Sequence, residues 1–143
     1  MAIPSTVPSV GQFSFVVKQG SDLSISLTWL DDNGNPINLT GFAMKMVIRA
    51  FLGSPVALLT LSSANNTGSY IALGGAAGTI TLNFAHADTA GLQSNGIPLP
   101  GNPLFGGARV YPLGVYDLQY TDPLGNVGYL LEGSVSLDPQ VTT

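Results

Sequence analysis

Hydrophobic and polar residues alternate along much of this chain, which predicts short strands with one dry face. In residues 23–29, leucine, isoleucine and tryptophan take every second position, with serine and threonine between them. Only residues 86–92 have the character of a helix, of one or two turns. We expect an all-β chain with strands at 13–18, 23–30, 42–50, 56–61, 70–73, 79–84, 111–120 and 127–137.

Turn-forming residues separate these strands. Residues 31–36 read DDNGNP, in which glycine and asparagine accept positive φ and proline cannot continue a ladder. Residues 122–126 repeat the same chemistry, and residues 74–78 form a tight turn between two strands. Short strands joined as hairpins predict an antiparallel, immunoglobulin-like β-sandwich of about eight short strands. A small barrel is the alternative.

The 143 residues are enough for one domain with a sizeable core. We expect an N-terminal arm at 1–12, a single β-sandwich domain at 13–138 and a C-terminal tail at 139–143. Residues 93–108 are rich in proline and glycine and have no hydrophobic period, so they form one long loop. A loop of this length inside a compact domain usually carries function.

Charged residues are scarce in this sequence. They make up 8% of the chain, against about 25% in an ordinary soluble domain, while 45% of the residues are hydrophobic. One explanation is a surface of small polar residues. The explanation we favour is a surface covered by neighbours in a permanent assembly, because such interfaces are poor in charge.

The same composition excludes several classes of partner. The four basic residues stand singly and the net charge is −4, so we expect no nucleic-acid partner. There is no cysteine for disulfides or thiolate ligands. We expect no signal peptide and no membrane association, because the N-terminus has no basic and apolar segments and no apolar run approaches about 18 residues. The expected protein is soluble and made in the cytosol.

Few side chains suggest catalysis. His86 is the only histidine and Asp88 is two residues away, but no activated-nucleophile motif accompanies them, so a solvated histidine at a helix start is favoured. Glu132 is the only glutamate and Asp117 lies on the preceding predicted strand; an exposed pair of acids is favoured over a glycosidase pair. We expect no catalytic residues.

Ligand sites have similarly weak support. The acidic turn at 31–35 lacks the spacing of an EF-hand, so its carboxylates are expected to accept turn amides. Trp29 and the tyrosines suggest a sugar platform, but Trp29 shares its parity with Leu27, which favours core packing. We therefore expect no metal and no cofactor.

Several of these segments together resemble small tail-associated structural proteins of bacteriophages. The likeness is carried by 19–23 (QGSDL), the strand of Trp29, 32–41 (DNGNPINLTG), 46–49 (MVIR) and the closing runs at 116–118, 125–127, 131–135 and 141–142. It is nearest to the N-terminal domain of baseplate upper proteins and covers most of the chain apart from 93–110. The resemblance implies a β-sandwich module, usually oligomeric, that joins tail or baseplate components to receptor-binding parts. Relative to a full baseplate upper protein, we expect this chain to be a single domain without a stalk or receptor-binding part.

The expected function is that of a non-enzymatic virion structural protein, an oligomeric adaptor assembled in the bacterial host cytoplasm. Its expected partners are other virion proteins and copies of itself. A capsid decoration (cement) protein and a host-glycan-binding module are the alternatives, and a glycan hydrolase is a more distant one.

We expect the contacts with partners to lie in the arm and in the loop from 93 to 109. Apolar residues there have no strand to bury them, and loops on a rigid sandwich commonly carry binding residues. The alternative is that the loop caps one end of its own sandwich. The candidate partner-binding residues are Ile3, Val7, Leu99, Leu104, Phe105 and Arg109.

Overall fold

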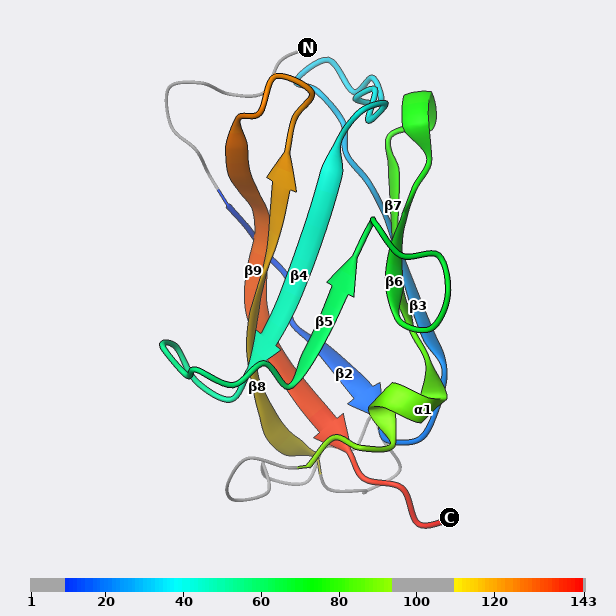
Figure 1. The fold of residues 1–143 in the computed structure, drawn as a ribbon, viewed down its shortest axis with the longest axis vertical. Coiled ribbons are helices and arrows are strands. Elements are labelled where there is room, and N and C mark those ends of the chain that lie inside the picture. The colour runs from blue at the N-terminus through cyan, green and yellow to red at the C-terminus, as the bar shows by residue number, and fades with distance from the viewer. Residues whose placement is uncertain (1–9, 94–109, 143) are drawn as a thin grey trace.

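The computed structural model describes residues 10–93 and 110–142, and Figure 1 shows the path of the chain. A single turn of 3₁₀ helix, η1 (Gly75–Ala77), precedes β7, and a short helix, α1 (His86–Thr89), follows it. The strands in the described residues are β1 (Gly11–Gln12), β2 (Phe15–Lys18), β3 (Leu23–Thr28), β4 (Ala43–Arg49), β5 (Leu59–Ser62), β6 (Tyr70–Leu73), β7 (Thr79–Phe84), β8 (Tyr111–Thr121) and β9 (Val127–Asp138).

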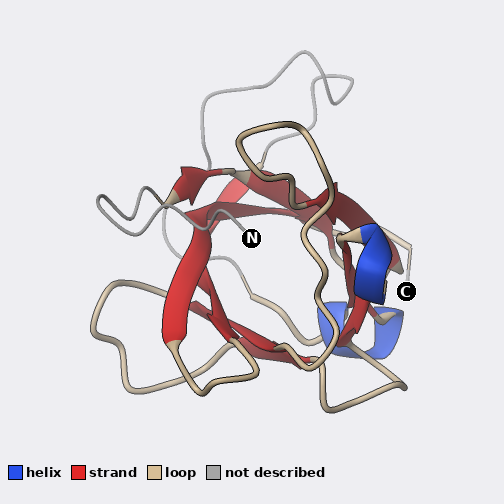
Figure 2. Cartoon of the chain, turned by 90° about the horizontal axis from the view of Figure 1, so that it is seen from above, coloured by secondary structure: helices blue, strands red, loops and turns tan. Residues whose placement is uncertain are grey.

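The strands form two sheets that pack face to face as a β-sandwich. The larger sheet has the order β1-β9-β8-β4-β5, with β2 also paired to β9, and the smaller sheet has the order β3-β7-β6. Seen from above in Figure 2, the strands surround a common centre. The expectation of an all-β sandwich built from two sheets is therefore confirmed.

Alternation along the strands builds the core. Every second residue of β4, β7 and β8 points inward, so that Met46, Ile80 and Leu118 are fully buried while their chain neighbours are more exposed. Both sheets supply these side chains, and burying them removes apolar surface from water, the dominant stabilising term. The largest fully buried side chains are Leu39, Met46, Ile48, Leu61, Ile71, Ile80, Leu82, Leu113, Leu118, Leu137, Val17 and Val135.

Two acidic turns have the same construction. The carboxylate of Asp31 accepts the backbone amides of Asn33 and Asn35, at 2.9 and 3.0 Å. The carboxylate of Asp122 accepts those of Leu124 and Asn126, at 2.9 Å each. The glycine at the fourth position of each turn has positive φ, 80° at Gly34 and 87° at Gly125. The prediction that acidic residues of 31–35 accept turn amides is confirmed for Asp31.

The expectation of a wholly antiparallel sandwich is wrong for the N-terminal strands. Both β1 and β2 run parallel to β9, with Gly11 opposite Leu131 and Phe15 opposite Val135. Alternation of apolar and polar residues shows which face of a strand is buried, but it carries no information on the direction of a neighbour 120 residues away. Gly11 and Gln12, the end of the expected arm, belong to this pairing.

Some expected element boundaries also move. The expected strand at 56–61 begins only at Leu59, because residues 50–58 form a structured loop, and the expected helix at 86–92 ends at Thr89. The expected strand at 23–30 ends at Thr28, and Leu30 forms an isolated bridge with Pro36. Among the described residues, no helix is long and apolar enough to cross a membrane.

Candidate functional site

A row of side chains crosses the outer face of the larger sheet. Val47 on β4 is opposite Asp117 on β8, Asp117 is opposite Glu132 on β9, and Glu132 is opposite Gln12 on β1. The side-chain amide of Gln12 donates a hydrogen bond of 2.7 Å to Glu132 Oε1. The register therefore brings together the two acids that sequence analysis considered as a pair, and both are exposed.

Electrostatics distinguish Asp117 from an ordinary surface acid. Partial burial raises the pKa of Asp117, the charge of Glu132 raises it further, and Arg49 opposes both effects. Like charges directly opposite one another in a sheet are destabilising. The row thus concentrates negative charge on a protein that has few charged groups.

The loop of residues 50–58, which we call the β4–β5 loop, stands beside this row at the lower left of Figure 1. Arg49 donates from its guanidinium to the carbonyl of Ser54, at 3.2 Å, and the buried Ser54 hydroxyl accepts the amide of Val56. Gly53 makes the turn with φ of 88°. The start of the loop packs against Gly114, where an added Cβ would lie 2.0 Å from the carbonyl oxygen of Arg49. These contacts hold the loop in one shape.

The β4–β5 loop presents apolar side chains to solvent. Phe51 is 59% exposed, Leu52 93% and Val56 60%. Val115, Val127 and Tyr129 add three further exposed apolar side chains on the outer face of β8 and β9. The loop and the row line an open hollow of about 650 Å³, to which Asp117, Glu132, Phe51 and Leu52 all contribute. Exposed apolar groups that gather on one face of a soluble protein commonly mark an interaction site.

This arrangement is suited to binding. Carboxylates and the Gln12 amide are hydrogen-bonding groups, and the exposed side chains of Phe51 and Leu52 offer apolar surface that a ligand or a partner protein can cover. Within the residues that the structure describes, no group of three or more histidine, cysteine or acidic side chains is placed to hold a metal ion. No protein family and no curated protein matches this chain. A functional proposal therefore depends on the geometry of its residues.

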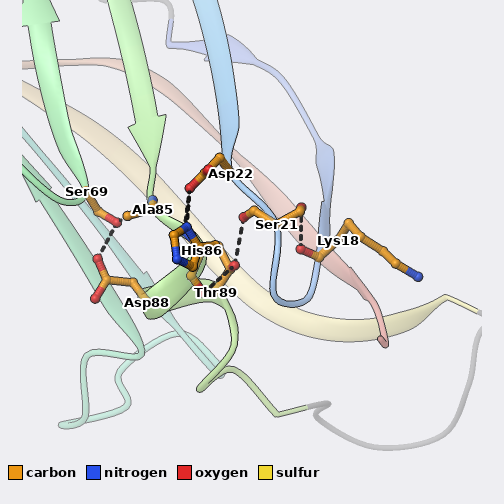
Figure 3. A network of polar contacts seen from close by, with 8 residues as sticks. All are labelled: Lys18, Ser21, Asp22, Ser69, Ala85, His86, Asp88 and Thr89. Carbon is orange, nitrogen blue, oxygen red and sulfur yellow. Dashed lines mark hydrogen bonds and ion pairs between the residues drawn. The ribbon is translucent and has the colours of Figure 1, made fainter. Parts of the chain in front are cut away.

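The structure separates the two residues considered as part of a catalytic triad. The ring Nδ1 of His86 lies 3.0 Å from a carboxylate oxygen of Asp22, not of Asp88. Asp88 instead accepts a hydrogen bond of 2.5 Å from the hydroxyl of Ser69 (Figure 3). The side chain of His86 is 69% exposed at the first residue of α1. This confirms the interpretation of His86 as a solvated residue at a helix start.

The contacts in Figure 3 anchor α1 to the sandwich. The N-cap residue of α1 is Ala85, which has no side chain able to cap the helix. Ser69 accepts the amide of Ala85, and Asp22 accepts the amide of His86 at 2.7 Å. The buried hydroxyl of Thr89 donates to the carbonyl of Ser21. Side chains from distant segments thus replace a local cap, and this network has a structural role.

Aromatic packing accounts for Trp29. Its ring centroid lies 5.1 Å from that of Tyr120 and 6.0 Å from that of Phe42. Tyr116 is buried on the same side of β8 as Leu118. The interpretation of these residues as packing groups is confirmed, although Trp29 remains half-buried.

The candidate partner-binding residues are not part of this site. Ile3, Val7, Leu99, Leu104, Phe105 and Arg109 lie outside the described residues. The sequence pattern did not single out the β4–β5 loop, because Val56 falls in the expected strand at 56–61 and Phe51 and Leu52 fall between the expected strands. The available signal was the Phe51-Leu52 pair, which stands directly before a glycine, a serine and a proline.

Proposed function

We propose that this chain is a non-enzymatic structural protein of a bacteriophage virion, an oligomeric adaptor that joins tail or baseplate components to fibre or receptor-binding parts. The observation that carries the proposal is the structured β4–β5 loop, which holds Phe51 and Leu52 in solvent beside exposed apolar residues of the outer face. Obligate interfaces are apolar and poor in charge, and the sequence has 8% charged residues.

The strand order supports an immunoglobulin-like form of the sandwich. The smaller sheet, β3-β7-β6, matches the B-E-D order of that fold, and β9-β8-β4-β5 matches G-F-C with one added strand. Such sandwiches are stable platforms whose loops and outer faces bind partners. This topology is consistent with the family resemblance that the sequence suggests.

Oligomer formation is the first test of the proposal. We expect the purified chain to be an oligomer by light scattering, and the double variant Phe51→Ser, Leu52→Ser to dissociate. Leu124→Ser is the matched control, because Leu124 is 88% exposed but lies in the β8–β9 turn. A parent chain that stays monomeric at high concentration, with no partner, would contradict the adaptor role.

Location in the particle is the second test. Immunogold labelling of phage particles with antibodies to this chain should place it on the tail or baseplate. Labelling spread over the capsid would instead support a decoration protein, and particles without label would contradict any virion role. The variant His86→Ala, at a residue outside the hollow, should leave infectivity unchanged if the chain has no catalytic function.

One feature favours a second candidate, a host-glycan-binding module. The hollow combines Asp117, Glu132 and Gln12, which are able to hydrogen-bond to sugar hydroxyls, with the exposed ring of Phe51. Glycan-array binding by the parent chain that Glu132→Gln and Phe51→Ser abolish would favour this candidate over the adaptor.

A further inference from the structure

Opposite charges occupy neighbouring rows on the outer face of the larger sheet. The acidic row holds Asp117 on β8 directly opposite Glu132 on β9. Two residues further along the strands is a second row, in which Lys45 on β4 is opposite Gln119 and Gln119 is opposite Tyr129. We call this second set the Lys45 row. Two residues of a strand span about 7 Å, so the acids and the base lie close together on one face.

Lys45 does not neutralise the acidic row of its own chain. Its side chain is exposed, and among the described residues it forms no salt bridge. The basic residue that lowers the pKa of Asp117 is Arg49, and its effect is smaller than those of burial and of the Glu132 charge, which raise this pKa. The face therefore presents an exposed ammonium and an acidic pair, and each can form an ion pair with another molecule.

Exposed apolar side chains lie at both ends of this face. At one end the β4–β5 loop holds Phe51 and Leu52, which are 59% and 93% exposed. Towards the other end Val127 and Tyr129 are 59% and 46% exposed on β9. Figure 1 shows the loop beyond the lower end of β4 and the turn between β8 and β9 at the upper end. Apolar groups gathered on one face of a soluble protein indicate a protein–protein contact.

A twofold axis perpendicular to this face joins each feature to its complement. In a twofold dimer the same surface meets itself, so every contact between two different residues is made twice. An axis that passes between the two rows brings Lys45 of one copy onto the acidic row of the other, where Asp117 and Glu132 line the hollow. The rotation also reverses the strand direction, so the loop of each copy approaches Val127 and Tyr129 of the other.

We propose that this face binds a second copy of the chain about a twofold axis. Lys45 of each copy pairs with the acidic row of the other, and the β4–β5 loop packs on Tyr129 of the other. Charge complementarity favours a copy of this chain, because a purely basic partner would satisfy the acids but would repel Lys45. The inference rests on the proposed function, since it names the partner of the surface that the adaptor role requires.

Charge reversal tests this pairing in the full chain. We expect Lys45→Glu and Glu132→Lys each to raise the dissociation constant at least tenfold, because like charges then meet at both symmetric contacts. An equimolar mixture of the two variants should associate almost as tightly as the parent, since both contacts of the mixed pair again join opposite charges. Sedimentation equilibrium measures the three association constants. Only a twofold contact between these two rows predicts recovery in the mixture.

Asp32→Lys is the matched control for Glu132→Lys, because it makes the same charge change at an exposed turn residue and should associate like the parent. If a reversed chain does not fold, the milder Lys45→Gln must still weaken association.

Unchanged association in the charge variants, or no recovery in their mixture, would overturn the proposal. If the parent is nevertheless an oligomer that Phe51→Ser, Leu52→Ser dissociates, the adaptor role stands and only the twofold pairing is wrong. A parent that stays monomeric, with no partner, would contradict both.

Discussion

Asp117 and Glu132 lie directly opposite one another on β8 and β9, on the outer face of the larger sheet. The pairing places two carboxylates side by side, and Gln12 donates a hydrogen bond to one of them. The pKa of Asp117 is raised by burial and by the Glu132 charge, despite the opposing influence of Arg49. Such a pair costs stability in the isolated domain, so its presence is consistent with a binding role for the hollow.

We expect Asp117→Asn to stabilise the protein at neutral pH by about 0.2–1 kcal/mol, because it removes the opposed like charges. A raised folded-state pKa means that the folded protein favours protonated Asp117. The preference of the folded state for protonated Asp117 therefore contributes its full stability below pH 3.8, the ordinary pKa of an aspartate. This contribution is lost as the pH rises through the folded-state pKa. The stability gained by Asp117→Asn should therefore appear as the pH rises through this pKa, and it should vanish in strong acid. Asp32→Asn, an exposed acid in a turn, is the control of equal net charge, and an equal gain there would contradict the pairwise origin.

We expect Tyr116→Phe to destabilise the protein by about 1 kcal/mol, because the Tyr116 hydroxyl donates to the carbonyl of Phe13. Burial raises the pKa of Tyr116 from 10 to about 12. The parent should therefore lose stability as the pH rises from about 10 through about 12, and this loss should be smaller in the variant. Urea unfolding at several pH values measures both effects. The exposed Tyr129→Phe is the control, and the same alkaline behaviour in both variants would exclude Tyr116 as the cause.

Gly128→Ala should destabilise the protein by about 1–3 kcal/mol through overpacking. Gly128 is opposite Tyr120 in the β8–β9 ladder, and an added Cβ would lie 2.5 Å from the ring carbon Cζ of Tyr120. That ring packs on Trp29, so near-ultraviolet circular dichroism should change as well. Gly91→Ala is the control, because an added Cβ there would lie 3.7 Å from the carbonyl oxygen of Asp88, an ordinary contact. Unchanged stability in Gly128→Ala would show that the ring moves aside freely.

Ser69→Ala should cost about 1–3 kcal/mol, because it leaves the amide of Ala85 without this acceptor and removes the hydrogen bond to Asp88. Thermal unfolding measures the loss, and hydrogen exchange should be faster in α1. Ser24→Ala removes an exposed hydroxyl that bonds to Asn83 and should change stability by less than about 0.5 kcal/mol. Equal effects in the two variants would mean that Ser69 does not anchor α1.

The local elements could be predicted from the sequence because their causes are local. The alternation of Leu23 to Leu27 is sufficient to define a strand and its buried side. Asp31, Gly34 and their counterparts Asp122 and Gly125 make their hydrogen bonds and positive φ angles within five residues. Steric restrictions and short-range hydrogen bonds act in the same way wherever such a segment occurs, so the pattern is readable without the rest of the chain.

The arrangement of these elements was decided by tertiary structure. Nothing near Phe15 indicates that its neighbour is Val135 or that the two strands run parallel. The same holds for His86, whose partner is Asp22 rather than the nearby Asp88. The β4–β5 loop keeps its shape because Arg49 and Ser54 interact at the end of β4, in a sheet that exists only after folding. Contacts between residues far apart in sequence depend on the whole packed core, so only the folded chain determines them.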